Sequence, residues 1–145
     1  MVEEIRSKGR LIYSNHGTSM MPLIKQGRDL VVIVKPALPL RKYDVPLYRR
    51  GDSPKFVLHR ILKVTPEGYV IRGDNCLYKE YGIKDEDIIG VLSAVVRKGK
   101  EIPVDSFALR SYARVWTFIF PVRFCLMKAR ALCGRVKRKI IGKKN

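Results

Sequence analysis

Three residues of types used in nucleophilic catalysis occur in the order Ser19, His59 and Asp74. Ser19 lies in the stretch HGTSMMP, where Gly17 and Pro22 favour a tight turn. A serine hydroxyl is a poor nucleophile at neutral pH, so it needs a general base within hydrogen-bond reach and N–H donors for the developing oxyanion. These residues predict an acyl-transfer site if the fold brings them together. A serine in a turn otherwise serves as a cap or a turn former.

The candidate bases are the two histidines of the chain. His59 lies in the apolar stretch KFVLHRILKV, and on a strand its side chain would share a face with Val57 and Ile61. His16 is three residues before Ser19, and a neighbour on a turn rarely points back at the hydroxyl. We therefore expect His59 to be the base, with a purely structural histidine as the alternative.

The candidate orienting acid is Asp74, in the sequence RGDN. The stretch with His59 is followed by Pro66-Glu67-Gly68 and then by YVIR, a pattern typical of a β-hairpin. A hairpin with its turn near Glu67 would bring residues 59 and 74 close across the two strands. Asp74 would then hold the tautomer of the imidazole and stabilise the imidazolium that forms.

Short β-branched stretches between turn residues predict the strands that position these side chains. We expect strands at residues 10–14, 29–35, 44–50, 55–64, 69–72 and 87–98. Pro46 predicts an edge position for its strand, because proline cannot donate to a ladder. Gly99 and Pro103 are expected to end the β-rich part, which gives a β domain over 1–103.

The remaining residues, 104–145, differ in composition from this domain. The chain carries 30 Lys and Arg against 13 Asp and Glu, a net charge of +17, and eleven of the basic residues lie in the last forty positions without an acidic one. Residues 105–139 predict one or two amphipathic helices, with a kink or break at Pro121. One side of such a helix would carry Arg110, Arg114, Thr117, Lys128, Arg135 and Lys139.

This basic segment has two interpretations that the sequence leaves open. With Trp116, Phe118, Phe120 and Phe124 it suits the interface of an anionic membrane. The same aromatic side chains could instead pack on the β domain. Nucleic-acid binding is disfavoured despite the charge, because no helix-turn-helix, zinc or RNP-like motif is present.

Three cysteines, Cys76, Cys125 and Cys133, form neither a metal-binding spacing nor an even disulfide framework. The simplest interpretation is a reducing compartment. The first eighteen residues lack the apolar core of a secretory signal, and no apolar run reaches the roughly 18 residues that a spanning helix needs. We expect a cytoplasmic protein, either free or peripheral at the inner face of the membrane.

Six short stretches together resemble the signal peptidase I and LexA-like superfamily of serine peptidases. In order, they are GTSMMP, GRDLVVIV, YDVPLYR, VLHRI, RGDN and IIGVLSAVVR, and they span roughly residues 10–98. The resemblance implies a mainly β fold, with a β-barrel-like core of twisted antiparallel sheets, followed here by the basic helical segment. It also implies that Ser19 is the nucleophile and that His59 is the base, as in the endoplasmic-reticulum and archaeal type.

The resemblance extends to the residues around the nucleophile. Gly17, Thr18, Met20 and Pro22 would form the oxyanion and substrate loop. The family uses an acid after its GDN element, before a Leu-Tyr pair, and this chain lacks it. The site is therefore either a Ser-His-Asp triad with Asp74 or a Ser-His dyad. No metal or organic cofactor is implied.

The predicted function is that of a serine endopeptidase that hydrolyses a peptide bond in a peptide or protein precursor through an acyl-enzyme. The alternatives are a non-catalytic relative that binds peptides, or a protein that binds a membrane surface or nucleic acid. The order Ser, His, Asp favours the enzyme.

Overall fold

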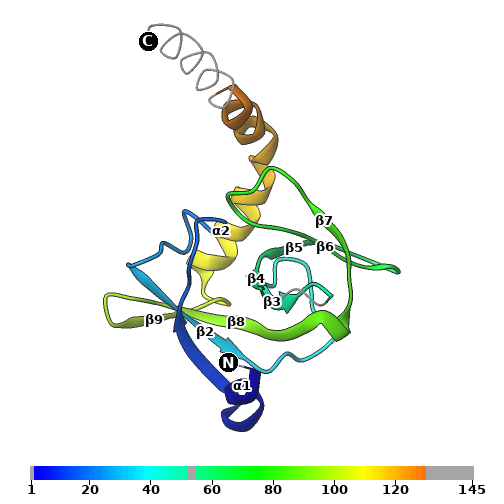
Figure 1. Ribbon diagram of the computed structural model, residues 1–145. Helices are drawn as coiled ribbons and strands as arrows, with labels where there is room; N and C mark the ends of the chain where they lie inside the picture. Colours follow the sequence, from blue (N-terminus) through cyan, green and yellow to red (C-terminus); the bar gives the residue numbers. More distant parts are fainter. Residues whose placement is uncertain (1, 52–54, 130–145) are drawn as a thin grey trace, which may run out of the picture.

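The computed structural model describes residues 2–51 and 55–129 (Figure 1). Antiparallel strands dominate the described chain, and helices lie at both of its ends. The sheets curl into a half-barrel, and the C-terminal helical residues lead away from it (Figure 1). The predicted mainly β architecture with C-terminal helices is therefore confirmed.

The larger sheet has six strands, and β8 (Ile88–Arg97) pairs with three of the others. The order along the sheet is β1 (Arg10–Ser14), β2 (Asp29–Val34), β8, β3 (Pro46–Arg49) and β4 (Phe56–Leu58), and β9 (Lys100–Pro103) also pairs with β8. All of these pairings are antiparallel. The β-branched residues that fill β2 and β8 suit strands packed against a core.

The smaller sheet contains β5 (Arg60–Thr65), β6 (Gly68–Arg72) and β7 (Glu80–Ile83). β5 and β6 form the predicted hairpin, with Arg60 opposite Arg72. The single stretch predicted over 55–64 is in fact two strands, β4 and β5, which belong to different sheets. His59 is the one residue between them, so it lies where the chain passes from the larger sheet to the smaller.

Two clusters of buried apolar side chains hold the sheets together. The cluster of the larger sheet includes Ile5 from α1 (Val2–Lys8) and Met20 from the loop after β1. The other cluster lies between β3 and the smaller sheet; it contains Leu40, Tyr48, Ile61, Tyr69, Ile71 and Ile83, with Val57 packed against it. Val57 and Ile61 therefore do contact the same cluster, as the strand alternation predicts.

The C-terminal helix begins where Ser106 caps it. The hydroxyl of Ser106 accepts a hydrogen bond from the N–H of Leu109 at 3.4 Å, and α2 then runs over Phe107–Phe118. Ile119 forms a turn, and residues 120–129 are helical again, so the predicted break near Pro121 is confirmed. The predicted positions of residues 135 and 139 lie outside the described residues. Within the described chain, no helix is long and apolar enough to cross a membrane.

Three features differ from the sequence predictions. β3 lies between β8 and β4 and is not an edge strand; Pro46 is tolerated because it is the first residue of that strand. Gly99 does not end the sheet: Lys98 and Gly99, with φ of 51° and 75°, form a tight turn into β9. Neither α1 nor β7 was predicted. The 3-10 helix η1 (Asp85–Asp87) leads from β7 into β8.

Candidate active site

The loop that carries Ser19 is fixed by the residues that follow the serine. Met20 and Ile24 are fully buried, and the N–H of Ile24 donates to the carbonyl of Met20 at 3.0 Å. At the start of the loop, Gly17 has a φ of 108°, and its N–H donates to the side chain of Gln26 at 3.0 Å. Ser19 itself is half-buried. Burial of the Met20 side chain in the core therefore fixes the position of the preceding residue, Ser19, near the surface.

This finding corrects the role predicted for Met20. Its side chain belongs to the core cluster and has no exposed surface, so it cannot line a substrate groove. Gly17, Thr18 and Pro22 are exposed on the same loop and remain available to a substrate. The N–H groups of Ser19 and Met20 have no hydrogen-bond partner among the described residues.

The Ser19 loop docks on the turn that follows β6. The N–H of Asn75 donates to the carbonyl of Ser19 at 2.7 Å, and its side-chain amide donates to the carbonyl of Thr18 at 3.2 Å. The turn is closed by a hydrogen bond from the N–H of Cys76 to the carbonyl of Gly73 at 3.0 Å. Residues more than fifty positions apart are thereby held in contact through the backbone.

His59 has a carboxylate partner, which is Glu80. The Nδ1 atom of His59 lies 3.0 Å from Oε1 of Glu80, and the hydroxyl of Tyr48 donates to the same oxygen at 2.8 Å. A carboxylate acceptor at Nδ1 favours the tautomer that carries its proton there, which leaves the lone pair on Nε2. Burial lowers the pKa of the His59 imidazole below its ordinary 6.5, and Glu80 opposes part of that effect. These two effects favour a neutral imidazole whose lone pair is on Nε2.

Asp74 does not fill the role that the sequence assigned to it. Its carboxylate accepts two hydrogen bonds of 2.8 Å from Arg60 and one of 3.1 Å from the hydroxyl of Tyr112. The side chains of Arg60 and Asp74 are both only 4% exposed, so the pair is a buried structural contact. Glu80, and not Asp74, is the carboxylate that contacts His59.

Gly73 lies between the Ser19 loop and the imidazole. A Cβ atom at this position would come within 2.7 Å of the Ser19 carbonyl oxygen and 2.9 Å of Cδ2 of His59. The glycine therefore lets the two predicted catalytic elements approach each other. Within the described chain the Ser19 hydroxyl makes no hydrogen bond, to His59 or to another residue. The structure thus places the Ser19 loop and His59 both next to Gly73, with no hydrogen bond between the side chains of Ser19 and His59.

Cys76 is a second nucleophilic side chain beside the base. Its sulfur lies 3.9 Å from Nε2 of His59 and would lie within 2.7 Å of a Cβ atom at position 73. Burial raises the pKa of the Cys76 thiol above its ordinary value, which disfavours the thiolate. This environment resembles that of a structural cysteine more than that of an activated one.

Glu80 was missed because its strand has no clear signal. The sequence EYGI alternates poorly, and glycine is uncommon in strands. The pairing of Ile61 with Ile71, and of Ile71 with Glu80, places Glu80 on the same side as Ile61 and therefore as His59. Prediction of a third strand in this sheet would have identified the acid.

The described residues contain no group of three or more His, Cys, Asp or Glu side chains arranged to hold a metal ion. Comparisons of the chain with protein-family models, with curated proteins and with solved structures found no match.

Proposed function

We propose that this protein is a serine peptidase with the fold of the signal peptidase and LexA-like superfamily. Ser19 is the nucleophile, His59 the general base, and Glu80 the residue that orients the base. One observation carries the proposal: the basic Nε2 side of a carboxylate-paired histidine meets the turn on which the serine loop is docked. The order of the six matching stretches along the sequence supports the same fold.

In this mechanism Nε2 of His59 takes the proton of Ser19 as the hydroxyl attacks the scissile carbonyl. The oxyanion of the tetrahedral intermediate accepts hydrogen bonds from the N–H groups of Ser19 and Met20. The imidazolium then protonates the leaving amine, and a water molecule hydrolyses the acyl-enzyme with His59 again as the base. The Ser19–His59 hydrogen bond, absent in the resting site, has to form when substrate binds.

The substrate class that this site supports is a peptide or protein precursor. Gly17, Thr18 and Pro22 are exposed beside Ser19, so a polypeptide chain can reach the hydroxyl. A non-catalytic relative that binds peptides through the same loop is the alternative. The carboxylate at Nδ1 favours the enzyme, because peptide binding alone does not require an oriented imidazole.

The test is covalent labelling with a fluorophosphonate and, in parallel, a peptide boronate, followed by peptide mapping. We expect an adduct on Ser19 that is lost in Ser19→Ala and strongly reduced in His59→Ala. Cys76→Ala is the matched control, because it removes the other nucleophile beside Nε2, and it should label as the wild type does. Labelling that survives in Ser19→Ala but disappears in Cys76→Ala would reject Ser19 as the nucleophile.

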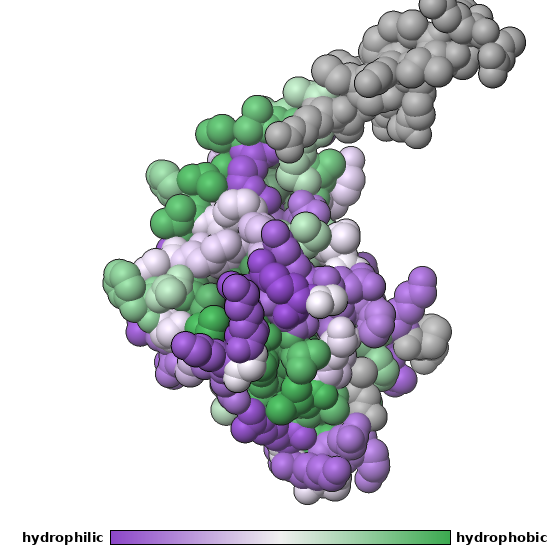
Figure 2. All heavy atoms as spheres, turned by 90° about the vertical axis from the view of Figure 1, so that its left-hand side faces the viewer, coloured by the Kyte–Doolittle hydropathy of each residue, from purple (hydrophilic) through white to green (hydrophobic). Residues whose placement is uncertain are grey.

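A membrane surface is the second partner that we propose, on a separate observation. Val115, Phe118, Val122 and Leu126 are exposed and follow one another three or four residues apart, so they share one side of the C-terminal helical segment. Phe118 is 85% exposed, and Figure 2 shows hydrophobic surface along this upper part of the molecule. With the positive charge of the segment, this arrangement fits an interfacial helix.

Two of the other aromatic side chains predicted to meet the membrane, Trp116 and Phe120, contact the β domain instead. Trp116 stacks on Tyr112 and donates to the carbonyl of Asp74 at 3.0 Å, and the ring of Phe120 lies 3.1 Å from the guanidinium carbon of Arg72. One side of the helix therefore packs on the β domain, and the exposed side is the one that we propose for the membrane. Free thiols at Cys76 and Cys125 fit a reducing compartment, and we propose a peripheral position at the cytoplasmic face of a membrane.

A further inference from the structure

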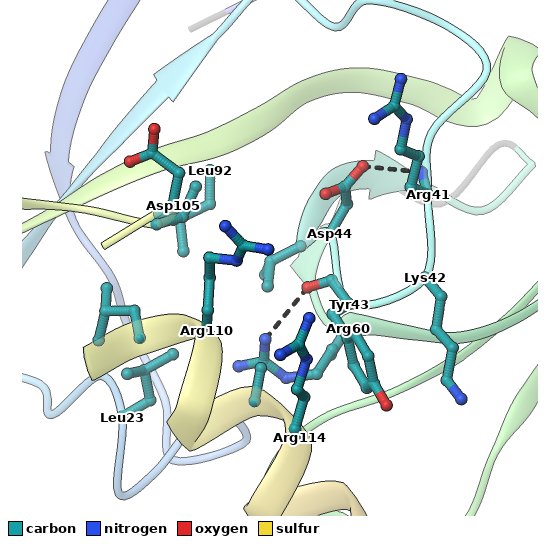
Figure 3. A pocket seen from close by; sticks show the side chains of 14 residues that line it. Leu23, Arg41, Lys42, Tyr43, Asp44, Arg60, Leu92, Asp105, Arg110 and Arg114 are labelled. Atoms are coloured by element: carbon teal, nitrogen blue, oxygen red, sulfur yellow. Dashed lines mark hydrogen bonds between the residues drawn. The ribbon is translucent and has the colours of Figure 1, made fainter. Parts of the chain in front are cut away.

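A cavity of about 400 Å³ lies between the first half of α2 and the segment at residues 41–45 (Figure 3). It is separate from the candidate active site. Arg60 lines this cavity, whereas His59 points to the opposite side, toward Tyr48 and Glu80. A volume of this size is within the range of pockets that bind small molecules.

One part of the cavity lining is strongly basic. Arg110 and Arg114 extend from α2 toward the segment with Tyr43 and Asp44, and Arg41 and Lys42 lie on the other side (Figure 3). Within the described chain, Arg110 and Arg114 make no ion pair or side-chain hydrogen bond. They are one helical turn apart, so both guanidinium groups reach the same space. Two unpaired guanidinium groups on one side of a cavity are a typical arrangement for a doubly charged oxyanion.

The carboxylates in the cavity do not neutralise this charge. Among the described residues, Asp44 and Asp105 are the acidic ones that line it, and Asp44 accepts a hydrogen bond of 2.7 Å from the N–H of Arg41. The fifth cation, Arg60, is already paired with Asp74. Arg41, Lys42, Arg110 and Arg114 therefore leave a net positive charge, to which the N-terminal end of α2 adds its own partial charge.

The floor of the cavity is apolar. It is formed by Leu23, Val45, Leu92, Val104, Leu109 and Ala113. Leu23, Val45, Leu92 and Ala113 are each less than 9% exposed, so they belong to the core and form a fixed surface. A ligand that fills this space would place an apolar part on the floor and an anionic part at the guanidinium groups.

We propose that this cavity binds a phosphate monoester that carries an apolar chain. The phosphate would lie between Arg110 and Arg114, and the chain would contact the apolar floor. The ligand is either a lipid with a phosphate monoester head group or a free alkyl phosphate, since both present the same chemistry. The proposal does not depend on the peptidase activity.

The test uses the fluorescence of Trp116, the single tryptophan of the chain, which lies on α2 three residues after Ala113 of the cavity lining. Decyl phosphate, below its micelle concentration, is titrated into the full-length protein beside decanol and inorganic phosphate. We expect decyl phosphate to bind at least about tenfold more tightly than either, because decanol lacks the charge and phosphate lacks the chain. Decanol that binds as tightly as decyl phosphate would overturn the proposal.

The variant Arg110→Gln/Arg114→Gln should bind decyl phosphate at least about tenfold more weakly. Its control is Lys35→Gln/Lys100→Gln, which removes the same charge from two exposed residues outside the cavity and should bind as the wild type does. Equal losses in both variants, or no loss in either, would refute the site. If the arginine pair unfolds by circular dichroism, the single change Arg114→Gln gives the same comparison.

Vesicles distinguish the two sources of the ligand. Phosphatidylcholine vesicles with and without phosphatidic acid are titrated against the same variants. If the arginine variant loses more binding to the phosphatidic acid vesicles than the lysine variant does, the phosphate belongs to a lipid. Equal vesicle binding by the two variants, with decyl phosphate binding still reduced in the arginine variant alone, would assign it to a free alkyl phosphate.

Discussion

The contact between His59 and Glu80 gives the sharpest prediction, because the sequence pointed to a different acid. Glu80→Gln keeps the size of the side chain and a hydrogen-bond acceptor, but it removes the charge 3.0 Å from Nδ1. The carboxylate at present raises the pKa of His59 against the larger, lowering effect of burial. The substitution should therefore lower that pKa further, and the imidazole should stay neutral down to a lower pH.

The size of the effect on catalysis follows from the geometry. A hydrogen bond to a charged partner contributes about 1.5–3 kcal/mol. The side chains of His59 and Glu80 are 11% and 27% exposed, so water screens the pair only in part. Loss of that energy from the imidazolium in the transition state predicts a fall in kcat/KM of about 10- to 150-fold. The acid limb of the pH profile should move to lower pH at the same time.

The pKa can be measured without a substrate. The chain has two histidines, so the imidazole carbon resonances in an NMR titration can be assigned with His16→Gln. Asp74→Asn is the matched control, since it removes the charge of the acid that the sequence favoured. In this structure that change leaves Arg60 buried without a charged partner, which costs about 3–5 kcal/mol of unfolding free energy. It should have little effect on the pKa of His59, for which Asp74 is the smallest of the causes.

The two variants therefore separate the roles of the two acids. Glu80→Gln should shift the pKa of His59 and keep most of the unfolding free energy. Asp74→Asn should lower the unfolding free energy and leave the pKa of His59 nearly unchanged. The reasoning would be refuted if Asp74→Asn shifted the titration of His59 as far as Glu80→Gln does.

Four further predictions concern the elements around the site. Gly73→Ala should abolish labelling of Ser19 by the fluorophosphonate, because its Cβ would lie 2.7 Å from the Ser19 carbonyl oxygen; labelling at the wild-type rate would contradict the close approach. Met20→Ala should lower the unfolding free energy by about 2–5 kcal/mol in urea titrations, since its side chain is fully buried. Burial would raise the pKa of Asp29, but hydrogen bonds from two arginines and the N–H of Lys25 outweigh it and hold that pKa well below 3.8. The stability from this carboxylate is complete above the unfolded pKa of 3.8 and is lost only as the pH falls through the lower folded value. In thermal melts Asp29→Asn should therefore cost about 3 kcal/mol at pH 7, a cost that begins to fall near pH 4 and is still substantial at pH 3. Phe118→Ser should reduce cosedimentation with anionic vesicles and leave labelling of Ser19 unchanged, whereas equal cosedimentation would exclude this side of the helix from the membrane.

Local patterns in the sequence were enough to predict most strands and the central hairpin. The stretches over 10–14 and 29–35 are short, apolar and bounded by turn residues, and they form β1 and β2 with nearly those limits. The turn at Pro66-Glu67-Gly68 fixes the register in which Thr65 lies opposite Gly68. The predicted approach of residues 59 and 74 follows from that register, and it brings the imidazole against Gly73.

The partners of the polar side chains could not be predicted in the same way. Whether Asp74 contacts His59 or Arg60 depends on which side of the strand each one faces after the chain changes sheets at residue 59. The competing partner Tyr112 comes from α2, which is 38 residues further along the chain. Local patterns carry no information on such contacts, because these depend on how the helix packs against the half-barrel.

The C-terminal helices are joined to the site more closely than a membrane anchor would require. Tyr112 donates to the carboxylate of Asp74, and both Trp116 and Arg123 donate to its carbonyl, at 3.0 and 2.8 Å. Asp74 lies in the same turn as Gly73, where the serine loop and the imidazole meet. Any ligand or surface that moves α2 therefore acts directly on the turn that positions Ser19. The division of the chain near residue 103 separates two compositions, but these hydrogen bonds attach the helix to the turn on which the Ser19 loop docks.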